Sequence, residues 1–568
     1  MTGILWDTEN GQNTYDEINT VKPGFNSGWD KVMGPISRNN YTSMESKLFD
    51  LPGSYYSDPK FSWRIPIGVT AIEFFNSSII GKEYKNNIFV GDINNGNIYY
   101  FQVNNKNRAT LKFGNDINNA KQYSDLNDLV VDSKEETLDA DVKIIQDEKV
   151  VSYGACGMPY VIECIVKDFQ ELIERPPDVS KKEYCIDVIT NTRAQKIDGV
   201  KKEVYATDLQ SGRETIYEYD SLVVATGARA ILPNIKGVNQ KDGVFLIRNY
   251  GDGVKIYHST KNAFTCVIAG AGLIGLEMVE AFKERSARRK MDITVVEMSD
   301  HILPTMLDKN MAKIVERELE ANGVKVITGE RVEEIVGSTD GDVKAVKTNT
   351  NREIDADFIL LGSGVRPNSE IARDAGIELG YANAIKVDEY MRTNIPDIFA
   401  AGDCATVRSY ITNEDTYLPM GTTANKQGRI AGENAAGGSA RSRGIAGSAI
   451  TKVFDLYIGK IGLTRQEALK YGFDPIEEEI ESITRDGYYP ANKSIWIKIV
   501  ADKKSGRILG SQIIGGEAVK ERIDLIALAL LLKADIRDLA SYDACYVPPA
   551  SPVWEPVNIA ASQTAKQL

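Results

Sequence analysis

The distribution of apolar and polar positions divides the chain near residue 138. Beyond that point, short continuous apolar runs alternate with segments of helical periodicity, and several of the runs end in glycine. Such runs are typical of buried parallel strands that are each followed by a turn into a helix. The runs are DADVKII, YDSLVVATG, AFTCVIAGAG, DITVVE, GVKVITG, ADFILLGSG and IPDIFAAGD. The pattern predicts an α/β chain with a doubly wound architecture that occurs twice.

Residues 1–137 follow a different pattern. Short β-type runs at residues 4–6, 88–90 and 97–103 are separated by clusters of Asn, Gly and Pro. Runs of this length between turn-forming residues predict an all-β segment of antiparallel strands joined by tight turns.

The length and the charge balance of the chain indicate which kinds of partner it can bind. At about 150 residues each, the 568 residues suffice for roughly three or four domains. The chain has 67 Lys and Arg against 80 Asp and Glu, a net charge of -13, and no apolar run of about 18 residues. An acidic chain without clustered cations is a poor binder of nucleic acid or anionic membranes. We therefore expect small molecules and a second copy of the chain as partners.

Cysteine and histidine usage narrows the chemistry. The chain has six cysteines at irregular spacing and two histidines, His258 and His301. These numbers do not suit a disulfide framework or a histidine metal cage, so no metal site is expected. The first residues also lack the basic start and apolar core of a secretory signal. The sequence therefore predicts a reduced, cytoplasmic protein.

The segment CVIAGAGLIGLEMVEAF predicts a dinucleotide-binding turn. Gly270, Gly272 and Gly275 come directly after an apolar run and open a helix, and Glu297 ends the next run. Gly270 would make the tight turn, Gly272 would admit a pyrophosphate, and Gly275 would let helix and strand pack closely. Glu297 would accept hydrogen bonds from a ribose, and no Arg or Lys follows it, which favours NADH over NADPH. The alternative is a glycine turn that serves packing alone.

A second chemical signal is the cysteine in KVVSYGACGMPY. The small residues around Cys156 suggest backbone that approaches a flat ligand, and a helix beginning there would lower the pKa of the thiol. The alternative is a small buried cysteine in a glycine turn. Cys164 lies eight residues further on, a spacing that does not match a dithiol pair, and Cys185 has the alternation of a strand-core residue.

Together, several motifs resemble the pyridine nucleotide-disulfide oxidoreductases, in the branch of coenzyme A disulfide reductases and NADH oxidases. They are YGACGMPY, LVVATGARAILPNIKG, GAGLIGLE, LLGSGVRPN, IFAAGDCA, LPMGTTANKQGRIAGENAAGG and YVPPASPVWEP. The resemblance implies two Rossmann-like nucleotide-binding domains and a C-terminal α+β dimerisation domain, and therefore a homodimer. The implied domains are an FAD domain at 138–258 and 380–447, an NAD(P)H domain at 259–379 and a dimerisation domain at 448–568.

The resemblance also implies roles for single residues. Cys156 would be the redox-active thiol, Tyr546 would donate a proton or orient the leaving thiol, and Tyr488 or Tyr489 would lie near it. Glu277 would position the nicotinamide, or would be an exposed helix carboxylate. Asp403 would contact the flavin ribityl chain, and residues 424–429 would lie along the isoalloxazine. The implied cofactor-binding residues are Ala225, Thr226, Gly227, Gly364, Asp403, Ala424 and Gln427.

These roles imply an FAD-dependent NAD(P)H oxidoreductase that reduces coenzyme A disulfide or a related disulfide through one cysteine. One alternative is an NADH oxidase or peroxidase that cycles the cysteine through sulfenic acid. Another is a non-catalytic, NAD-binding remnant. The chain has no histidine after His301, which excludes reductases with a C-terminal His-Glu pair.

Two departures from the family pattern concern the flavin. Residues 3–29 and 86–101 resemble the glucose and sorbosone dehydrogenase β-propeller, and residues 1–137 supply only part of such a ring. This propeller-like segment stands where the family has its first strand, glycine turn and helix. Gln146 also replaces the usual ribose-binding Glu. We therefore expect a fusion of two incomplete proteins, an open sheet edge and weakened FAD binding.

Overall fold

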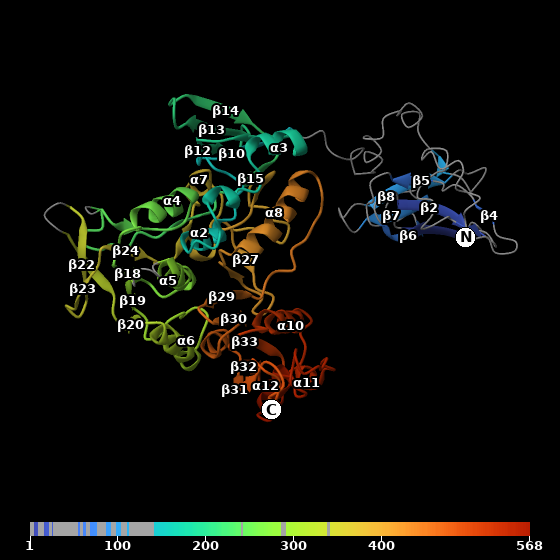
Figure 1. Cartoon of the computed structure of the whole chain (residues 1–568). Helices are drawn as coiled ribbons and strands as arrows, with labels where there is room; N and C mark the ends of the chain where they lie inside the picture. Colours follow the sequence, from blue (N-terminus) through green and yellow to red (C-terminus); the bar gives the residue numbers. More distant parts are fainter. Residues whose placement is uncertain are drawn as a thin grey trace. The chain divides into compact units, whose positions relative to one another are not determined.

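The computed structural model describes residues 141–239, 242–285, 291–337 and 341–568, and before them the backbone of nine strands between residues 5 and 112. The chain divides into two compact units, residues 1–140 and 141–568 (Figure 1). Within these described ranges, no helix combines the length and the hydropathy that crossing a bilayer requires.

The described strands of the first unit are mostly antiparallel. One sheet has the order β1 (Leu5–Glu9), β2 (Asp16–Val21) and β5 (Phe61–Trp63). A second has the order β6 (Val69–Phe75), β7 (Asn87–Asp92), β8 (Ile98–Val103) and β9 (Leu111–Lys112). The short strands β3 (Phe25–Asn26) and β4 (Tyr55–Tyr56) pair in parallel. The expected β runs fall on β1, β7 and β8, so the all-β prediction is confirmed for these strands.

In the second unit, a five-stranded parallel sheet forms what we call the second Rossmann-like half. Its order is β17 (Val244–Phe245), β24 (Phe358–Leu361), β18 (Thr265–Ala269), β19 (Asp292–Glu297) and β20 (Val324–Thr328). Helices α4 (Tyr250–Ser259), α5 (Leu273–Arg285) and α6 (Lys309–Ala321) pack against it, and the antiparallel strands β21 (Val332–Gly337), β22 (Val343–Thr348) and β23 (Glu353–Asp355) precede β24. The central strands are apolar and buried, as their continuous apolar runs predict.

The first Rossmann-like half has two separate parallel pairs in place of one sheet. Strand β10 (Val142–Ile145) pairs with β11 (Ile186–Ile189), and β15 (Leu222–Val224) pairs with β26 (Ile398–Ala400). Between them in sequence lie the antiparallel strands β12 (Thr192–Asp198), β13 (Glu203–Asp208) and β14 (Glu214–Glu218). The helices of this half are α2 (Met158–Ile162), α3 (Pro177–Tyr184), α7 (Glu370–Asp374) and α8 (Gly421–Ala435), with the 3₁₀ turns η5 (Ala155–Gly157), η6 (Phe169–Leu172) and η7 (Tyr381–Asn383).

Two equivalent loops join the halves. After β15 the chain turns at Gly227 into β16 (Ala228–Ala230), and after β24 it turns at Gly364 into β25 (Val365–Pro367). Both glycines have positive φ, 65° and 80°, a conformation that favours glycine. Because β16 and β25 pair with each other, the two Rossmann-like halves share one antiparallel link.

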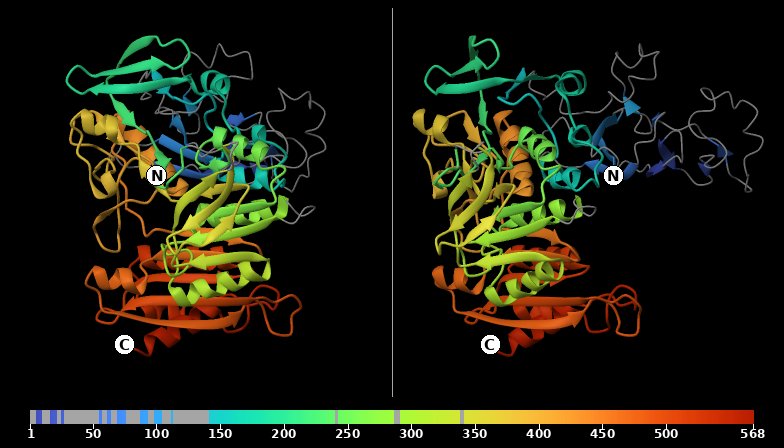
Figure 2. Two further views of the ribbon diagram at one scale, coloured as in Figure 1. Left: turned by 90° about the vertical axis from the view of Figure 1, so that its left-hand side faces the viewer. Right: turned by 60° about the vertical axis from the view of Figure 1, so that its left-hand side comes forward.

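The C-terminal region is a five-stranded antiparallel sheet covered by helices. Its order is β29 (Ala449–Val453), β30 (Leu456–Gly462), β33 (Ile508–Gly515), β32 (Ser494–Asp502) and β31 (Pro475–Ile483). The helices are α9 (Arg465–Lys470), α10 (Val519–Leu531), α11 (Ile536–Ser541) and α12 (Pro556–Ala565), and a small ladder of β27 (Val407–Arg408) and β28 (Asp415–Thr416) precedes them. Figure 2 shows this sheet as a layer at the C-terminal end, next to the second Rossmann-like half. The predicted α/β fold with a C-terminal α+β region is confirmed.

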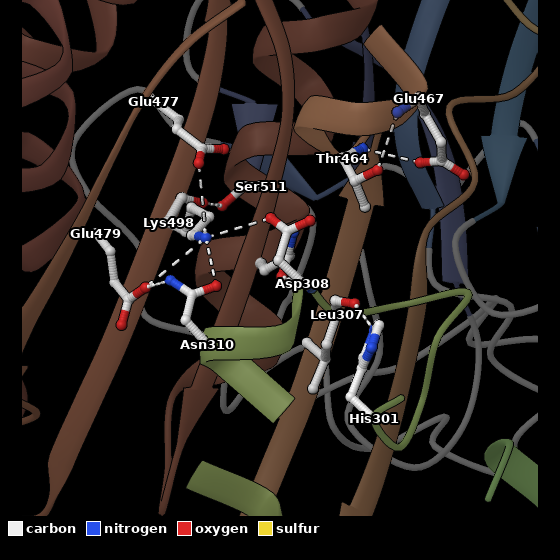
Figure 3. Close-up of polar contacts among 11 residues, drawn as sticks. His301, Leu307, Asp308, Asn310, Thr464, Glu467, Glu477, Glu479, Lys498 and Ser511 are labelled. Carbon is white, nitrogen blue, oxygen red and sulfur yellow. Dashed lines mark hydrogen bonds and ion pairs between the residues drawn. The ribbon is translucent and has the colours of Figure 1, made fainter. Parts of the chain in front are cut away.

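A buried lysine joins this sheet to the second Rossmann-like half (Figure 3). The side chain of Lys498 in β32 is 3% exposed, and its Nζ donates to Asn310 Oδ1 at 2.8 Å. Three carboxylates surround the ammonium group: Asp308 at 3.2 Å, Glu479 at 3.7 Å and Glu477 at 3.9 Å. Asp308 and Asn310 lie at the start of α6. The contact therefore fixes the position of α6, and with it the five-stranded parallel sheet, on the C-terminal sheet.

Candidate functional site

The glycine turn after β18 has the geometry that its spacing predicts. Gly270 has φ 110°, and a Cβ there would lie 2.5 Å from the carbonyl oxygen of Gly362. A Cβ on Gly275 would lie 2.1 Å from the carbonyl oxygen of Gly270, whereas one on Gly272 would meet no atom within 4 Å. Gly270 and Gly275 are thus required by packing, and the space beside Gly272 is open. An open backbone at a helix N-terminus suits a pyrophosphate.

Glu297 closes this turn from the end of β19. Its carboxylate is buried and accepts hydrogen bonds from the N–H groups of Ala271 and Ser299, both at 2.8 Å. The carboxylate is therefore held at the carboxyl end of the sheet, beside the glycine turn, where a ribose would meet it.

The loop with Cys156 is packed by Leu172. The N–H of Gly154 donates to the carbonyl of Leu172 at 2.8 Å, and a Cβ on Gly157 would lie 2.4 Å from Leu172 Cδ2. The small residue at 157 is thus explained by packing within the chain. Cys156 itself is exposed, in the turn η5 that precedes α2.

The electrostatic surroundings of Cys156 differ from the expectation. Nearby protein atoms partly desolvate the thiol and raise its pKa, the Glu277 carboxylate raises it further, and the Arg248 guanidinium opposes both. The expected lowering by a helix N-terminus was wrong. The reason is that neighbouring protein atoms desolvate the thiol and the Glu277 carboxylate of α5 adds to this effect, while the helix that follows, α2, has only five residues.

Glu277 is not the exposed helix carboxylate of the alternative reading. It is partly buried, burial raises its pKa, and Thr451 Oγ1 donates to it at 3.1 Å. Its charge acts on Cys156, so one carboxylate of the second Rossmann-like half faces the thiol of the first. The structure thereby brings together two motifs that lie 121 positions apart in the sequence.

Asp403 is held by a residue that the sequence did not single out. Arg248, just before α4, forms an ion pair with Asp403 at 2.7 Å and also donates to the carbonyl of Ala228 at 2.9 Å. Tyr417 donates to the carbonyl of Asp403 at 3.0 Å. No local motif marks Arg248, because its role arises only when the loop after β17 meets the end of β26.

The other flavin-motif residues surround the same strand ends. Gln427 in α8 is buried, accepts from the N–H of Gly402 at 3.0 Å and donates to the carbonyl of Thr406 at 2.8 Å. Ala424 lies one turn earlier in α8, and a Cβ on Gly402 would touch its Cβ at 3.6 Å. Ala225 and Thr226 are exposed at the end of β15, and the carbonyl of Thr226 accepts from Asn368 at 2.9 Å.

The two proposed tyrosines lie next to each other. The hydroxyls of Tyr488 and Tyr546 are 3.4 Å apart, and Tyr546 donates to Asp486 at 2.8 Å. These hydrogen bonds raise the pKa of Tyr546. Tyr489 instead lies under the guanidinium of Arg485. Among the described contacts, none joins either hydroxyl of the pair to Cys156 of the same chain.

Three of the other cysteines lie in strand, turn or helix-end positions. Cys404 is buried and its thiol points to the carbonyl of Val224 at 3.3 Å, and Cys266 is buried in β18. The strand-core reading of Cys185 was wrong: it is exposed with φ 55° at the end of α3, because β11 begins only at Ile186.

The resemblance implies FAD, and the described residues fit one end of it. Asp403, which Arg248 holds within electrostatic range of Cys156, would meet the ribityl chain, and Ala424 at the start of α8 lies beside the neighbouring Gly402. The phosphate end needs a glycine turn at a helix N-terminus. Among the described residues of the first Rossmann-like half, no strand followed by such a turn is present. The fit is therefore incomplete at the pyrophosphate.

Comparison with family profiles gives three matches. Residues 132–428 match the profile described as "Pyridine nucleotide-disulphide oxidoreductase", and residues 448–556 match its dimerisation domain. Residues 1–124 match "Glucose / Sorbosone dehydrogenase". Both resemblances inferred from the motifs are thus confirmed.

Relatives and solved structures agree with these profiles. The chain is 39% identical over 432 residues to a protein of Methanocaldococcus jannaschii named NADH oxidase, covering 76% of this chain and 94% of that one. It is 36% identical over 424 residues to the NAD(P)H sulfur oxidoreductase (CoA-dependent) of Pyrococcus abyssi, covering 74% and 92%. A solved NAD-dependent persulfide reductase from A. fulgidus is similar with a TM-score of 0.72 and 38% identity, covering 76% and 79%.

Proposed function

Because the chain belongs to the pyridine nucleotide-disulphide oxidoreductase family, a family of FAD-dependent enzymes, we propose that it reduces coenzyme A disulfide or a related disulfide with NADH, through Cys156. The observation that carries this proposal is one exposed thiol within electrostatic range of both Glu277 and the Arg248–Asp403 ion pair. The next cysteine in the sequence, Cys164, lies eight positions further on and beyond α2, a spacing that does not match a dithiol pair.

The overall reaction consumes one NADH, one proton and one disulfide, and yields NAD⁺ and two thiols. The Cys156 thiolate attacks one sulfur of the substrate, forms a mixed disulfide and releases the other sulfur as a thiolate that takes up a proton. Two electrons from NADH then break the mixed disulfide and regenerate the Cys156 thiolate. When bound, the flavin of this family supplies the electron relay between the nicotinamide and sulfur.

The neighbouring side chains have distinct tasks in this scheme. Arg248 favours the thiolate form of Cys156, and it also holds Asp403 in place. Glu277 lies where α5 faces the thiol, so it would orient the nicotinamide and set the charge of the site. The open turn at Gly272 and the carboxylate of Glu297 would bind the NADH pyrophosphate and ribose.

Tyr546 and Tyr488 would act on the leaving thiol only across a dimer. They belong to the C-terminal region, which matches the family's dimerisation domain, and they make no described contact with Cys156 of their own chain. A second subunit is therefore needed to bring a tyrosine to the thiol. The pair Tyr546–Asp486 provides a hydroxyl held in a defined direction.

The test is Cys156→Ser in the full chain, with Cys164→Ser as the matched control. We expect C156S to lose NADH-dependent release of free thiol from coenzyme A disulfide while keeping the wild-type affinity for NADH. C164S should retain both. Turnover by C156S at the wild-type rate would refute the role of Cys156.

A second candidate function is NADH oxidation by oxygen or peroxide through a Cys156 sulfenic acid. The exposed, unpaired thiol favours it, and the M. jannaschii relative bears the name NADH oxidase. Oxygen or peroxide consumption and coenzyme A disulfide consumption, each measured against the same NADH concentration, separate the two reactions.

A further inference from the structure

The two Rossmann-like halves contain the same series of elements, with one omission. In the second half the order is β18, α5, β19, α6, β20, the antiparallel strands β21 to β23, and β24. In the first half, β10 corresponds to β19 and β11 corresponds to β20. The strands β12, β13 and β14 correspond to the three antiparallel strands, and β15 corresponds to β24. Among the described residues of the first half, nothing corresponds to β18 and α5.

Hydrogen bonds support this correspondence. Gln146, directly after β10, has the position that Glu297 has at the end of β19. The backbone carbonyl of Gln146 accepts from the N–H of Thr192 at 2.9 Å, and that of Glu297 accepts from the N–H of Glu330 at 3.1 Å. The loops after β15 and β24 also match, since both turn at a positive-φ glycine and then pair with each other.

The omission leaves two strand edges without a partner. Strand β18 pairs with β19 on one side and β24 on the other, so it lies in the middle of its sheet. The equivalent strands β10 and β15 each pair on one side only, with β11 and β26, and no described strand pairs with their other edges. Two-stranded parallel sheets are unusual, because parallel strands are normally buried inside larger sheets.

The exposure of side chains in β10 agrees with its unpaired edge. Val142 and Ile144 of β10 are 41% and 46% exposed, whereas Ile293 and Val295 of β19 are 2% and 0% exposed. In the second half, a Cβ on Gly362 would lie 3.2 Å from the carbonyl oxygen of Gly270. The corresponding Ala225, at the end of β15, is exposed.

Helix α8 has open space on the side away from its buried residues. Gly428 and Gly432, one turn apart, are exposed, and a Cβ on either would meet no atom within 4 Å. Small residues at this spacing let a second helix approach closely. The first half is therefore open both in the sheet and beside a helix.

We propose that β10 and β15 form an acceptor for one parallel strand, filled by a separate polypeptide that carries a strand, a glycine turn and a helix. This inference deepens the proposed function and rests on it, because the added turn would supply the phosphate-binding end of the flavin site. The occupant is a segment like Thr265–Arg285 of this chain. Residues 115–153 contain no glycine, so the stretch directly before this acceptor does not supply the turn itself.

Backbone alternation shows which groups would bind the added strand. The N–H of Gln146 donates to the carbonyl of Ile189 in β11. Because successive N–H groups of a strand point to opposite edges, the N–H of Ile144 also points toward β11, and the N–H of Lys143 points to the open edge. In β15, the N–H of Leu222 donates to the backbone carbonyl of Asp397 at 2.9 Å, so the N–H of Val223 faces the open edge. Lys143→Pro removes an open-edge donor without touching the β10–β11 bonds, and Lys143→Ala is its matched control.

The experiment uses the purified full chain and a synthetic peptide of residues 264–285 of this sequence with Cys266→Ser. The control peptide also carries Gly275→Leu, which the tight turn cannot accommodate. FAD binding is followed by quenching of flavin fluorescence, and backbone protection at residues 142–145 and 222–224 by hydrogen exchange. NADH binding is measured throughout as the test of a folded second half.

We expect the chain alone to bind FAD weakly, and the peptide to tighten FAD binding roughly tenfold or more and to protect both edges. The control peptide and K143P should show neither effect, and K143A should behave as wild type. Stoichiometric FAD on the chain alone, or no protection and no change in FAD affinity with the peptide, would overturn the proposal. FAD binding that requires the peptide, without disulfide reduction, would instead refute the proposed function and leave the acceptor standing.

Discussion

Replacing Gly275 with alanine tests whether the nucleotide turn is as rigid as its packing indicates. The new Cβ would lie 2.1 Å from the carbonyl oxygen of Gly270 and 3.3 Å from its carbon, and both atoms are backbone. The turn or α5 must therefore move by about 1 Å before the contact becomes ordinary. Overpacking of this kind costs about 1–3 kcal/mol.

The same distortion should weaken NADH binding, because we propose that the pyrophosphate meets the backbone of this turn. If NADH requires the undistorted turn, about 1–3 kcal/mol corresponds to an affinity lower by about fivefold to 150-fold. Gly272→Ala is the matched control for stability: its Cβ would meet no atom of the chain, so the variant should keep the wild-type Tm. It should nevertheless bind NADH more weakly, since the methyl group occupies the approach to the backbone.

The assay combines NADH titration by fluorescence with thermal unfolding of each variant. G275A should lose both affinity and Tm, and G272A affinity alone. The reasoning is refuted if G275A binds NADH and melts as the wild type does, or if G272A leaves the NADH affinity unchanged.

Three other predictions concern single polar side chains. Lys498→Met should lower the free energy of unfolding by about 2–4 kcal/mol at pH 7, because it leaves three partly buried carboxylates without their cation. Burial raises the pKa of Glu477, and the charge of Lys498 opposes this rise, so the folded variant should bind protons more tightly than the folded wild type. The loss of unfolding free energy relative to the wild type should therefore shrink between pH 7 and pH 5. A loss that is the same at both pH values would contradict this. Glu277→Gln removes a charge that raises the pKa of Cys156, so iodoacetamide should alkylate the thiol faster at pH 7, and a slower rate would speak against this contact. Tyr546→Phe should slow disulfide reduction with NADH affinity unchanged; unaffected turnover would exclude Tyr546.

Local signals in the sequence predicted much of the second Rossmann-like half. Gly270, Gly275 and Glu297 act within one strand–turn–helix–strand unit, and their roles follow from spacing because neighbours in sequence are neighbours in space there. The same holds for the apolar strands and for the β runs of the first unit. The flavin motif around Asp403 and Gln427 was also identifiable as a local pattern.

Contacts between distant segments were not predictable in this way. Arg248 reaches Asp403 across 155 positions, and Glu277 sets the charge at Cys156 from another half of the fold. The raised pKa of that thiol follows from partial desolvation and a carboxylate on a different helix, whereas its local sequence suggested a lowered one. A charge acts through distance in space, which a single sequence does not contain.

By itself, the sequence determined the fold class and the glycine turn after β18, and it predicted the reactive cysteine and the lack of the first family motif, because each of these signals lies in contiguous residues. Only the tertiary structure decided which groups act on the thiol, that Tyr488 and Tyr546 form a pair, and that β10 and β15 each keep one strand edge without a described partner. The physical reason is that hydrogen-bonding edges and buried charges are properties of pairs of segments. Their partners become defined only when the chain has folded.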